Sequence, residues 1–543
     1  MALQSLLRDG QLPDAVKNVD AKQAALGVVA ATVVYQCASW LIASVAEKNK
    51  MKRLGATSKP AVPSSTLPII HNTLDFVKHT EHLHDWLMTL VEEYQGRTFV
   101  LRALGRPDVV VFSSQESIED VMKKQFDSFP KGAFLADYFG DVFGEGIFVV
   151  NGVKWLHQRK TASNLFTARS LRESMTETIR KHTVHLRQIL LDAGAQDKTV
   201  DLHDLFSRLS AESFAEIGFG INMGMLDNNE GDHPFQVAFD RSQHSMTLRR
   251  FKPSWFWLFQ KRFKLGAEAQ ISEDAETIHT AVLDIIAESL KLRQSGATQE
   301  GPVNLVSLFL DSYEKSPDAK NGEFDPKYLV DVVVNFINAG RDTTAQALSW
   351  FFKNLTQHPE VTAKLRAELY EVLPGLMDGS IDTPTMEQVE QLTYLEAAIR
   401  ESLRLYPALP YSTKVAANDV VMSDGTFIRK GQSTAIPAYA YNRMKYVWGP
   451  DAAEYNPERF IDPETGKIIT YSPYKFFAFN AGPRICLGMN LAMLELKIVA
   501  ASLLSRVDLE VLNPDKVTYK VSLTLPVRDG MPTRVSPYTH KTL

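Results

Sequence analysis

The sequence predicts a mainly α-helical fold with small β-sheets, preceded by one N-terminal transmembrane helix. Three observations predict it. About 32 residues without a helix breaker extend from Pro326 to Pro359 and would form a helix of roughly 48 Å, and Leu329 to Ala339 within them are nearly continuously apolar. The remainder looks helical between Pro/Gly loops, with strand patterns only near each end. Residues 24–46 carry no charge and are long enough to span the hydrocarbon core of a bilayer.

The composition fits a globular domain. Hydrophobic residues make up 45% and charged residues 23% of the 543 residues, so the chain has enough apolar material for a large core. The net charge of −5 argues against a nucleic-acid partner. Two cysteines give no disulfide framework and favour a reducing, cytosolic environment.

The N-terminal region divides into three predicted segments. Residues 1–23 form a short lumenal segment, 24–46 a transmembrane anchor, and 47–68 a basic, Pro-rich linker that leads into one large domain, 69–543. Four basic residues follow the apolar run within seven positions, and basic flanks favour the cytoplasmic side. The large domain should therefore face the cytosol. A cleaved signal peptide and a buried core helix are the alternatives.

Local patterns predict the first elements of the domain. Thr98–Leu104 and Val109–Phe112 read as two strands joined by a turn, and a helix follows near Ser117–Lys124. A further helical segment opens at Trp155. The segment Phe251–Phe263 interleaves aromatic and basic residues, which suits either a membrane interface or plain core packing.

The loop that begins at Phe479 carries the most specific signal. Cys486 stands before an apolar, helix-forming run from Leu487 to about Val507, and a helix N-terminus favours the thiolate form of its side chain. A lone thiolate is a poor zinc site but can serve as the single axial ligand of a haem iron. The glycines at 482 and 488 would let the backbone pass close to a flat macrocycle. The alternative is a buried structural cysteine.

The spacing of Phe479, Gly482, Arg484, Cys486 and Gly488 resembles the haem-binding loop of the cytochrome P450 family. The resemblance implies the cytochrome P450 fold, with Cys486 as the iron ligand and Arg484 as a partner of a haem propionate. Three further parts of the sequence resemble motifs of the same family.

The first is an oxygen-activation motif, Ala339 to Thr344, in the middle of the long apolar helix. Thr hydroxyls in a buried helix can bond the carbonyl four residues back, which bends the helix and leaves a polar notch. The resemblance implies that Asp342 and Thr343 manage the protons of oxygen chemistry. Ala339 stands where some ω-hydroxylases carry a Glu that ester-links the haem, so we expect non-covalent haem b.

The other two motifs are a Trp-x-x-x-Arg pair and a charged triad. By resemblance, Trp155 and Arg159 hold a propionate, although a surface Trp–Arg stack is the alternative. Glu401, Arg404 and Arg459 would form a buried structural brace behind the haem loop. Position in the fold suggests a substrate-pocket wall that includes Asn335, Phe336, Asn338, Pro410, Tyr411, Ser412, Leu523 and Thr524.

Three stretches narrow the resemblance to the plant and fungal branch that hydroxylates fatty acids at the ω end: Gln158–Ser163, Trp448–Asp451 and Asn456–Phe460. We therefore expect a single-pass protein of the endoplasmic reticulum that hydroxylates medium- or long-chain fatty acids. Electrons would come from NADPH through a separate cytochrome P450 reductase, with cytochrome b5 as a further candidate partner. The alternatives are another lipid substrate (an alkane, a sterol or a xenobiotic), a hydroperoxide isomerase, and a non-catalytic haem or lipid carrier.

Overall fold

The computed structural model describes residues 30, 34, 42, 44–227, 233–294, 304–314 and 326–539. The chain divides into two compact units. The smaller comprises Met1–Lys59 with Val420–Phe427, and the larger comprises Pro60–Asp419 with Ile428–Leu543. In the smaller unit, residues 44–54 are helical, and the backbone N–H groups of Thr57 and Ser58 donate to the carbonyl of Gly425 at 3.0 and 3.2 Å.

The predicted membrane anchor, 24–46, lies almost wholly outside the described residues. In the part of the chain that the structure describes, no helix has the length and apolar character needed to cross a membrane.

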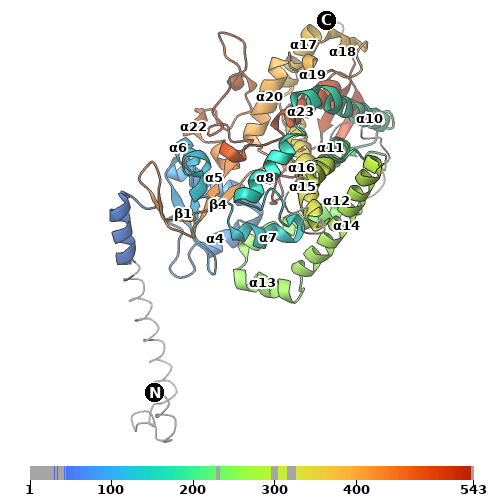
Figure 1. Ribbon diagram of the computed structural model, residues 1–543. Helices are drawn as coiled ribbons and strands as arrows, with labels where there is room; N and C mark the ends of the chain where they lie inside the picture. Colours follow the sequence, from blue (N-terminus) through green and yellow to red (C-terminus); the bar gives the residue numbers. More distant parts are fainter. Residues whose placement is uncertain are drawn as a thin grey trace, which may run out of the picture. The chain divides into compact units, whose positions relative to one another are not determined.

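The larger unit is mainly helical (Figure 1). Its α-helices are α4 (Thr73–Lys78), α5 (Leu83–Tyr94), α6 (Gln115–Glu119), α7 (Ala133–Phe143), α8 (Gly152–Ser163), α9 (Ala168–Ser170), α10 (Thr176–Ala195), α11 (Leu202–Phe219), α12 (Pro234–Leu248), α13 (Ser254–Arg262), α14 (Ala267–Gln294), α15 (Leu305–Glu314), α16 (Pro326–Gln357), α17 (Pro359–Val372), α18 (Pro374–Asp378), α19 (Met386–Val389), α20 (Thr393–Leu405), α21 (Ala438–Tyr441), α22 (Lys445–Trp448) and α23 (Met489–Leu504). Short helical turns used below are η2 (Asp120–Lys124), η5 (Arg249–Phe251), η7 (Pro457–Phe460) and η8 (Gly482–Arg484).

Three small sheets accompany these helices. The strands are β1 (Phe99–Leu101), β2 (Val109–Val111), β3 (Val200–Asp201), β4 (Ser412–Val415), β5 (Val420–Val421), β6 (Phe427–Ile428), β7 (Ser433–Ile436), β8 (Val507–Val511) and β9 (Pro532–Pro537). Their orders are β1-β2-β7-β4, β3-β9-β8 and β5-β6. The strand pair predicted from the turn at 105–108 is confirmed, because β1 and β2 pair antiparallel with Phe99 opposite Val111.

The long helix α16 is the central element of the larger unit. It runs for 32 residues from Pro326 to Gln357, and Pro359 is the first residue of α17. The two prolines therefore bound the helix, as the sequence predicted. Residues 329–338 are buried without interruption, because α16 packs against α11, α14, α20 and α23. The helix can therefore present one polar notch in an otherwise apolar wall.

Three predicted helices differ in their bounds. The helix predicted to open at Trp155 begins three residues earlier, at Gly152. The segment predicted at Ser117–Lys124 begins at Gln115, because Ser114 and Ser117 form a capping box, and it continues as the π-helical turn η2. The helix predicted from Leu487 begins at Met489, with Gly488 at its N-cap, and ends at Leu504. Strand β8 begins at Val507, so the last residue of the apolar run belongs to a sheet.

Candidate functional site

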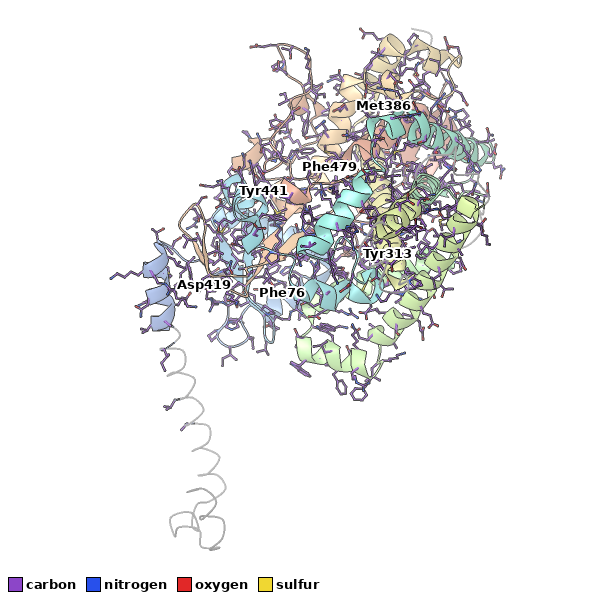
Figure 2. The ribbon with its side chains drawn as sticks, in the orientation of Figure 1. Phe76, Tyr313, Met386, Asp419, Tyr441 and Phe479 are labelled. Carbon is purple, nitrogen blue, oxygen red and sulfur yellow. The ribbon has the colours of Figure 1, made fainter. Side chains whose placement is uncertain are left out.

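The loop from Phe479 to Gly488 places Cys486 beside an internal cavity. The turn η8 reverses the chain, and the N–H of Cys486 donates to the carbonyl of Phe479 at 2.9 Å. Figure 2 labels Phe479, where the loop begins. The protein surrounds the thiol of Cys486. Its solvent-accessible surface faces the cavity.

The protein environment alone does not favour the thiolate. Burial raises the pKa of Cys486, and the N–H of Gly488 and the charge of Arg159 oppose this only in part. The backbone N–H at the start of the helix lowers the thiol pKa, as the sequence predicted, but burial outweighs this contribution. A haem iron bound by Cys486 would favour the thiolate, because a metal ion deprotonates a coordinating thiol.

The cavity has a volume of about 300 Å³ and a largely apolar wall. It brings together residues from α7, α8, α16, α23, the Cys486 loop and the segments around β4 and Thr524. The sequence-predicted residues that line it are Trp155, Arg159, Phe336, Asn338, Thr343, Tyr411, Ser412, Phe479, Arg484, Cys486, Gly488, Leu523 and Thr524.

Asn335 and Pro410, expected in the pocket wall, lie outside it. Asn335 is fully buried, and its Nδ2 donates to the carbonyls of Phe143 and Asp331 at 2.8 and 2.7 Å. Its Oδ1 accepts from the N–H of Phe148 at 3.2 Å, so this amide fixes the chain after α7. The carbonyl of Pro410 accepts from the N–H of Tyr439 at 3.2 Å. Both residues support the wall from behind.

Gly482 also lies outside the cavity. It adopts a φ of +63°, and a Cβ there would stand 1.9 Å from the carbonyl oxygen of Met122 in η2. The glycine expected to approach a macrocycle is instead required for contact between the Cys486 loop and η2. Gly488 lines the cavity, and the nearest atom to a Cβ at that position is 3.7 Å away, on Phe166.

The polar notch in α16 forms around Thr343. Its Oγ1 donates to the carbonyl of Ala339 at 2.6 Å, and Ala339, Gly340, Thr343 and Thr344 all line the cavity. A Cβ on Gly340 would lie 2.2 Å from the ring of Phe214, so the glycine allows α11 to approach α16 closely. The back-bonded hydroxyl remains next to the cavity, where it can exchange its hydrogen bond.

Asp342, expected to share the notch with Thr343, lies on another side of α16. Its Oδ1 accepts from Arg341 Nη1 at 2.7 Å, and its Oδ2 accepts from Gln243 Nε2 at 2.6 Å. Arg341 also pairs with Asp240, a half-exposed carboxylate. Burial, reinforced by the charge of Asp240, raises the pKa of Asp342 to about 6 although Arg341 and Gln243 oppose it. The carboxyl can thus exchange a proton near neutral pH.

Four buried or half-buried cations form what we call the cation cluster: Lys131, Arg159, Lys414 and Arg484. Three of them line the cavity with Cys486, and Lys414 lies beside Lys131 and Arg484 outside the lining, with its Nζ 4.5 Å from the centroid of the Phe126 ring. Arg484 lies 4.5 Å from the ring centroid of Trp155, and its Nη2 donates to the Val150 carbonyl at 2.8 Å. Burial and neighbouring cations lower the pKa of both Lys131 and Lys414 to about 7. Within the described residues, no member of the cluster forms an ion pair with a carboxylate.

The cation cluster fits a haem. Buried charges are normally paired, and four cations without an anion mark a site for negative groups from a ligand. Haem b carries two propionates, and the thiol of Cys486 lines the same cavity. Trp155, Arg159 and Arg484 would hold the propionates, as the resemblance implied. The sequence analysis did not predict Lys131 or Lys414 as members of this site. The only sequence signal for Lys414 is that a lysine lies within a short strand-like segment, 412–415.

We expect Lys131→Met to weaken haem binding without lowering the stability of the haem-free chain. Removing one charge-assisted contact should weaken haem binding by roughly 10-fold or more. The haem-free chain should be no less stable, because Met removes a cation that lacks a partner. Haem transfer to apomyoglobin measures the first quantity, and thermal unfolding of the haem-free chain measures the second. The control is Lys154→Met, at an exposed ion pair with Glu145. Equal haem transfer rates in both variants would contradict the assignment.

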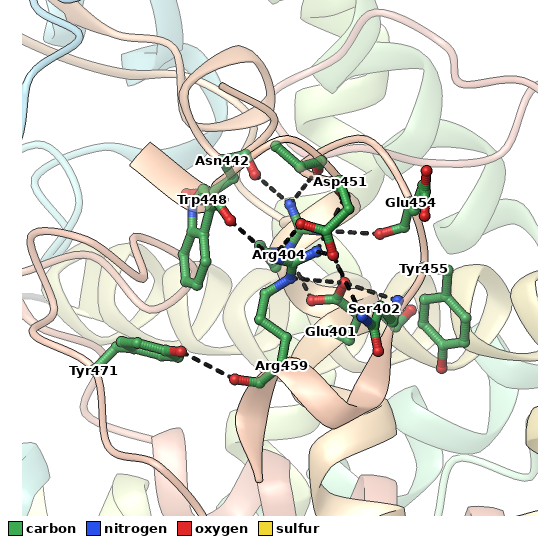
Figure 3. Close-up of polar contacts among 12 residues, drawn as sticks. Glu401, Ser402, Arg404, Asn442, Trp448, Asp451, Glu454, Tyr455, Arg459 and Tyr471 are labelled. Atoms are coloured by element: carbon green, nitrogen blue, oxygen red, sulfur yellow. Dashed lines mark hydrogen bonds and ion pairs between the residues drawn. The ribbon is translucent and has the colours of Figure 1, made fainter. Parts of the chain in front are cut away.

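The structure also brings together Glu401, Arg404 and Arg459 (Figure 3). Glu401 and Arg404 are fully buried and form two parallel contacts of 2.7 Å. Arg404 further donates to the carbonyls of Asn442, Ala452 and Glu454 at 2.6, 2.6 and 3.0 Å. Arg459 Nε lies 3.3 Å from Glu401, and its Nη2 binds the Asp451 carboxylate at 2.6 Å.

A row of aromatic rings connects this network with the Cys486 loop. The guanidinium of Arg404 lies 5.3 Å from the Trp448 ring. Trp448, Phe460, Phe476 and Phe479 follow one another with centroid separations of 6.0, 5.2 and 6.5 Å. Displacement of the buried charges would therefore be transmitted by direct packing to the residue at which the loop begins.

Comparison with known proteins agrees with these features. The family model described as Cytochrome P450 matches residues 60–530. Cytochrome P450 704C1 of Pinus taeda is 33% identical over 486 residues, which cover 87% of this chain and 92% of that protein. Cytochrome P450 86B1 and Cytochrome P450 94B3, both of Arabidopsis thaliana, are each 32% identical, over 83% and 87% of this chain and 81% and 91% of their own lengths. This chain therefore belongs to the cytochrome P450 family.

Proposed function

We propose that this chain hydroxylates medium- or long-chain fatty acids at or near the terminal carbon. The observation that carries the proposal is the apolar cavity that holds both the Cys486 thiol and the notch of α16. When bound, the haem iron supplies the activation of O₂. An apolar wall excludes water and admits a hydrocarbon chain, which suits oxidation of an unactivated carbon.

The side chains of this protein would position the haem and handle protons. Cys486 would bind the iron, and the cation cluster would hold the propionates. The hydroxyl of Thr343 would hold a proton at the cavity surface, since it needs only to leave the Ala339 carbonyl. Asp342 would resupply protons from the Asp240 side, because it titrates near neutral pH and shares Arg341 with that exposed carboxylate.

The choice of fatty acids rests on the resemblance of Gln158–Ser163, Trp448–Asp451 and Asn456–Phe460 to the ω-hydroxylase branch. Electrons would come from NADPH through a separate cytochrome P450 reductase, as is usual for membrane-bound members of the family. Haem b would be held without an ester bond, because Ala339 offers no carboxylate.

The surface of α13 supports association with a membrane. Trp255, Phe259 and Phe263 are 69%, 53% and 59% exposed, and Arg262 and Lys264 are exposed beside them. Aromatic and basic side chains at one surface suit the boundary between lipid and water. Flotation of the full chain with phospholipid vesicles, before and after Trp255→Ser with Phe259→Ser, tests whether α13 contributes to that association.

Product analysis tests the proposed reaction. The purified protein is incubated with NADPH, reductase and saturated fatty acids of graded length, and we expect terminal or near-terminal hydroxy acids.

In Thr343→Ala, the amount of product formed per NADPH consumed should fall on the order of 10-fold or more, because a positioned proton donor is lost. Thr356→Ala is the control, since Thr356 also bonds a carbonyl four residues back but lies outside the cavity.

Two outcomes would contradict these assignments. Normal coupling in Thr343→Ala would remove Thr343 from the proton path. Absence of hydroxy acids from a protein whose reduced-CO spectrum shows a thiolate-bound haem would exclude fatty acids and direct the search to alkanes, sterols or other lipids.

A further inference from the structure

Arg250 presents a charged group to the cavity at a place that the motifs do not mark. It lies in η5, the turn between α12 and α13, and lines the cavity together with Tyr411 and Phe139. Its guanidinium lies 5.3 Å from the centroid of the Tyr411 ring and 5.7 Å from that of Phe139. The protein encloses the charge, and burial lowers the pKa of Arg250.

The guanidinium of Arg250 has no anionic partner within the described residues. Its Nε is buried and makes no hydrogen bond. The adjacent Arg249 shows the usual arrangement: it pairs with Glu268 at 2.5 Å and Asp141 at 2.7 Å. The same turn therefore carries one arginine that is fully paired inside the fold and one whose donors remain available to the cavity.

Within the described residues, the titratable groups that surround Arg250 are Tyr411, Tyr138, Arg106, Lys131 and His84, and none of them is a carboxylate. Burial raises the pKa of Tyr411 to about 12, so its hydroxyl stays protonated and can donate. Arg106 adds a second positive charge nearby, and its Nη1 donates to the carbonyls of Arg249 and Lys252 at 2.9 and 3.0 Å. A buried group of this kind is stabilised by a carboxylate, which accepts from a guanidinium in a planar, bidentate geometry.

We propose that Arg250, with the hydroxyl of Tyr411, binds the carboxylate of the substrate. This inference rests on the proposed function. It adds the residues that would select a substrate by its carboxylate group. Arg250 and Cys486 line one cavity, so an acyl chain held by its carboxylate at Arg250 extends through the apolar remainder. The carbons farthest from the carboxylate are then the ones offered for oxidation, which accounts for ω rather than α or β selectivity.

A haem propionate is the other possible source of a carboxylate. Lys131 of the cation cluster lies within the electrostatic influence of both Arg484 and Arg250. The direct contacts of the two arginines differ, because the rings of Phe139 and Tyr411 flank Arg250, whereas Trp155 and the carbonyls of Ile147 and Val150 flank Arg484. These contacts favour the substrate as the partner of Arg250. Haem content separates the two sources, since loss of a propionate partner weakens haem retention and loss of a substrate anchor leaves it unchanged.

The test compares dodecanoic acid with dodecanol, which has the same chain length and no charge. Dissociation constants are measured on the holoenzyme by the Soret shift and by calorimetry. In Arg250→Gln, dodecanoate binding should weaken by about 10- to 100-fold, as expected for loss of a charge-assisted contact, while dodecanol binding changes by less than about 2-fold. Arg250→Lys should recover part of the affinity, and Tyr411→Phe should lose less than Arg250→Gln. Arg169→Gln is the control, at an exposed pair with Glu173.

The outcomes are distinct from those of the reaction test. Unchanged dodecanoate affinity in Arg250→Gln, an equal loss for both probes, or loss of haem would overturn the anchor. Hydroxylation that persists with such a result would leave the proposed function intact. Arg250-dependent binding of dodecanoate without any hydroxylated product would keep the anchor and reject the proposed reaction.

Discussion

Glu401→Gln should reduce the stability of the holoenzyme by about 3–5 kcal/mol and release haem. Glu401 is fully buried and accepts from both Arg404 and Arg459. The amide keeps the shape of the carboxylate but removes its charge, which leaves the fully buried guanidinium of Arg404 without a compensating anion, while Arg459 keeps its ion pair with Asp451. Because the aromatic row leads from this network to Phe479, the Cys486 loop should be displaced as well.

The measurements are chemical unfolding and haem content after gel filtration. Glu396→Gln is the matched control on the same helix, α20. Glu396 pairs with Arg400 and Lys497, and the side chains of Glu396 and Arg400 are 19% and 24% exposed, so water can replace the contact with Arg400 and part of the contact with the more buried Lys497. We expect the control to lose clearly less stability than Glu401→Gln. Equal losses from the two substitutions would mean that the buried network has no special role.

Gly482→Ala should destabilise the chain by about 2–5 kcal/mol, from a left-handed backbone angle and a steric overlap together. The Cβ would lie 1.9 Å from the Met122 carbonyl oxygen, so either the Cys486 loop or η2 has to move. Because backbone atoms collide, no side-chain rotation relieves the overlap. The free energy of unfolding and the reduced-CO spectrum report the two consequences.

Gly488→Ala provides the comparison six residues away. Gly488 has a φ of −92°, and the nearest atom to an added Cβ is 3.7 Å distant. Its effect on the unfolding of the haem-free chain should be below about 1 kcal/mol. Since Gly488 faces the cavity, the added methyl should act on haem affinity instead. A loss of stability as large as that of Gly482→Ala would show that the strain at Gly482 is not the cause.

The elements that the sequence predicted are those defined by local signals. Pro326 and Pro359 bound α16, and the turn at 105–108 joins β1 and β2. The cavity wall was predicted only in part, because adjacent positions in a helix point about 100° apart. Asn335 and Phe336 therefore face different neighbours, and so do Asp342 and Thr343.

Lys131 and Arg250 could not be found from the sequence. Each stands in a loop or a single turn, without periodicity or a motif around it. Their significance comes from the absence of an anionic partner among the residues that the structure describes, and that is a property of tertiary structure. Arg249 and Arg250 are identical letters in the sequence, and only their surroundings distinguish a packed ion pair from a candidate anchor.

The contacts of Arg404 have a consequence for how this protein can change over time. Besides Glu401, its guanidinium binds three main-chain carbonyls, those of Asn442, Ala452 and Glu454. Every amino acid presents the same carbonyl, so Arg404 constrains the course of that segment and leaves its composition open. The exposed side chain of Glu454 can be exchanged by mutation while the path of the loop is inherited unchanged, whereas Asn442 and Ala452 are fully buried and their packing limits what can replace them. Arg404 itself has no such freedom, because no other side chain donates in as many directions from one plane.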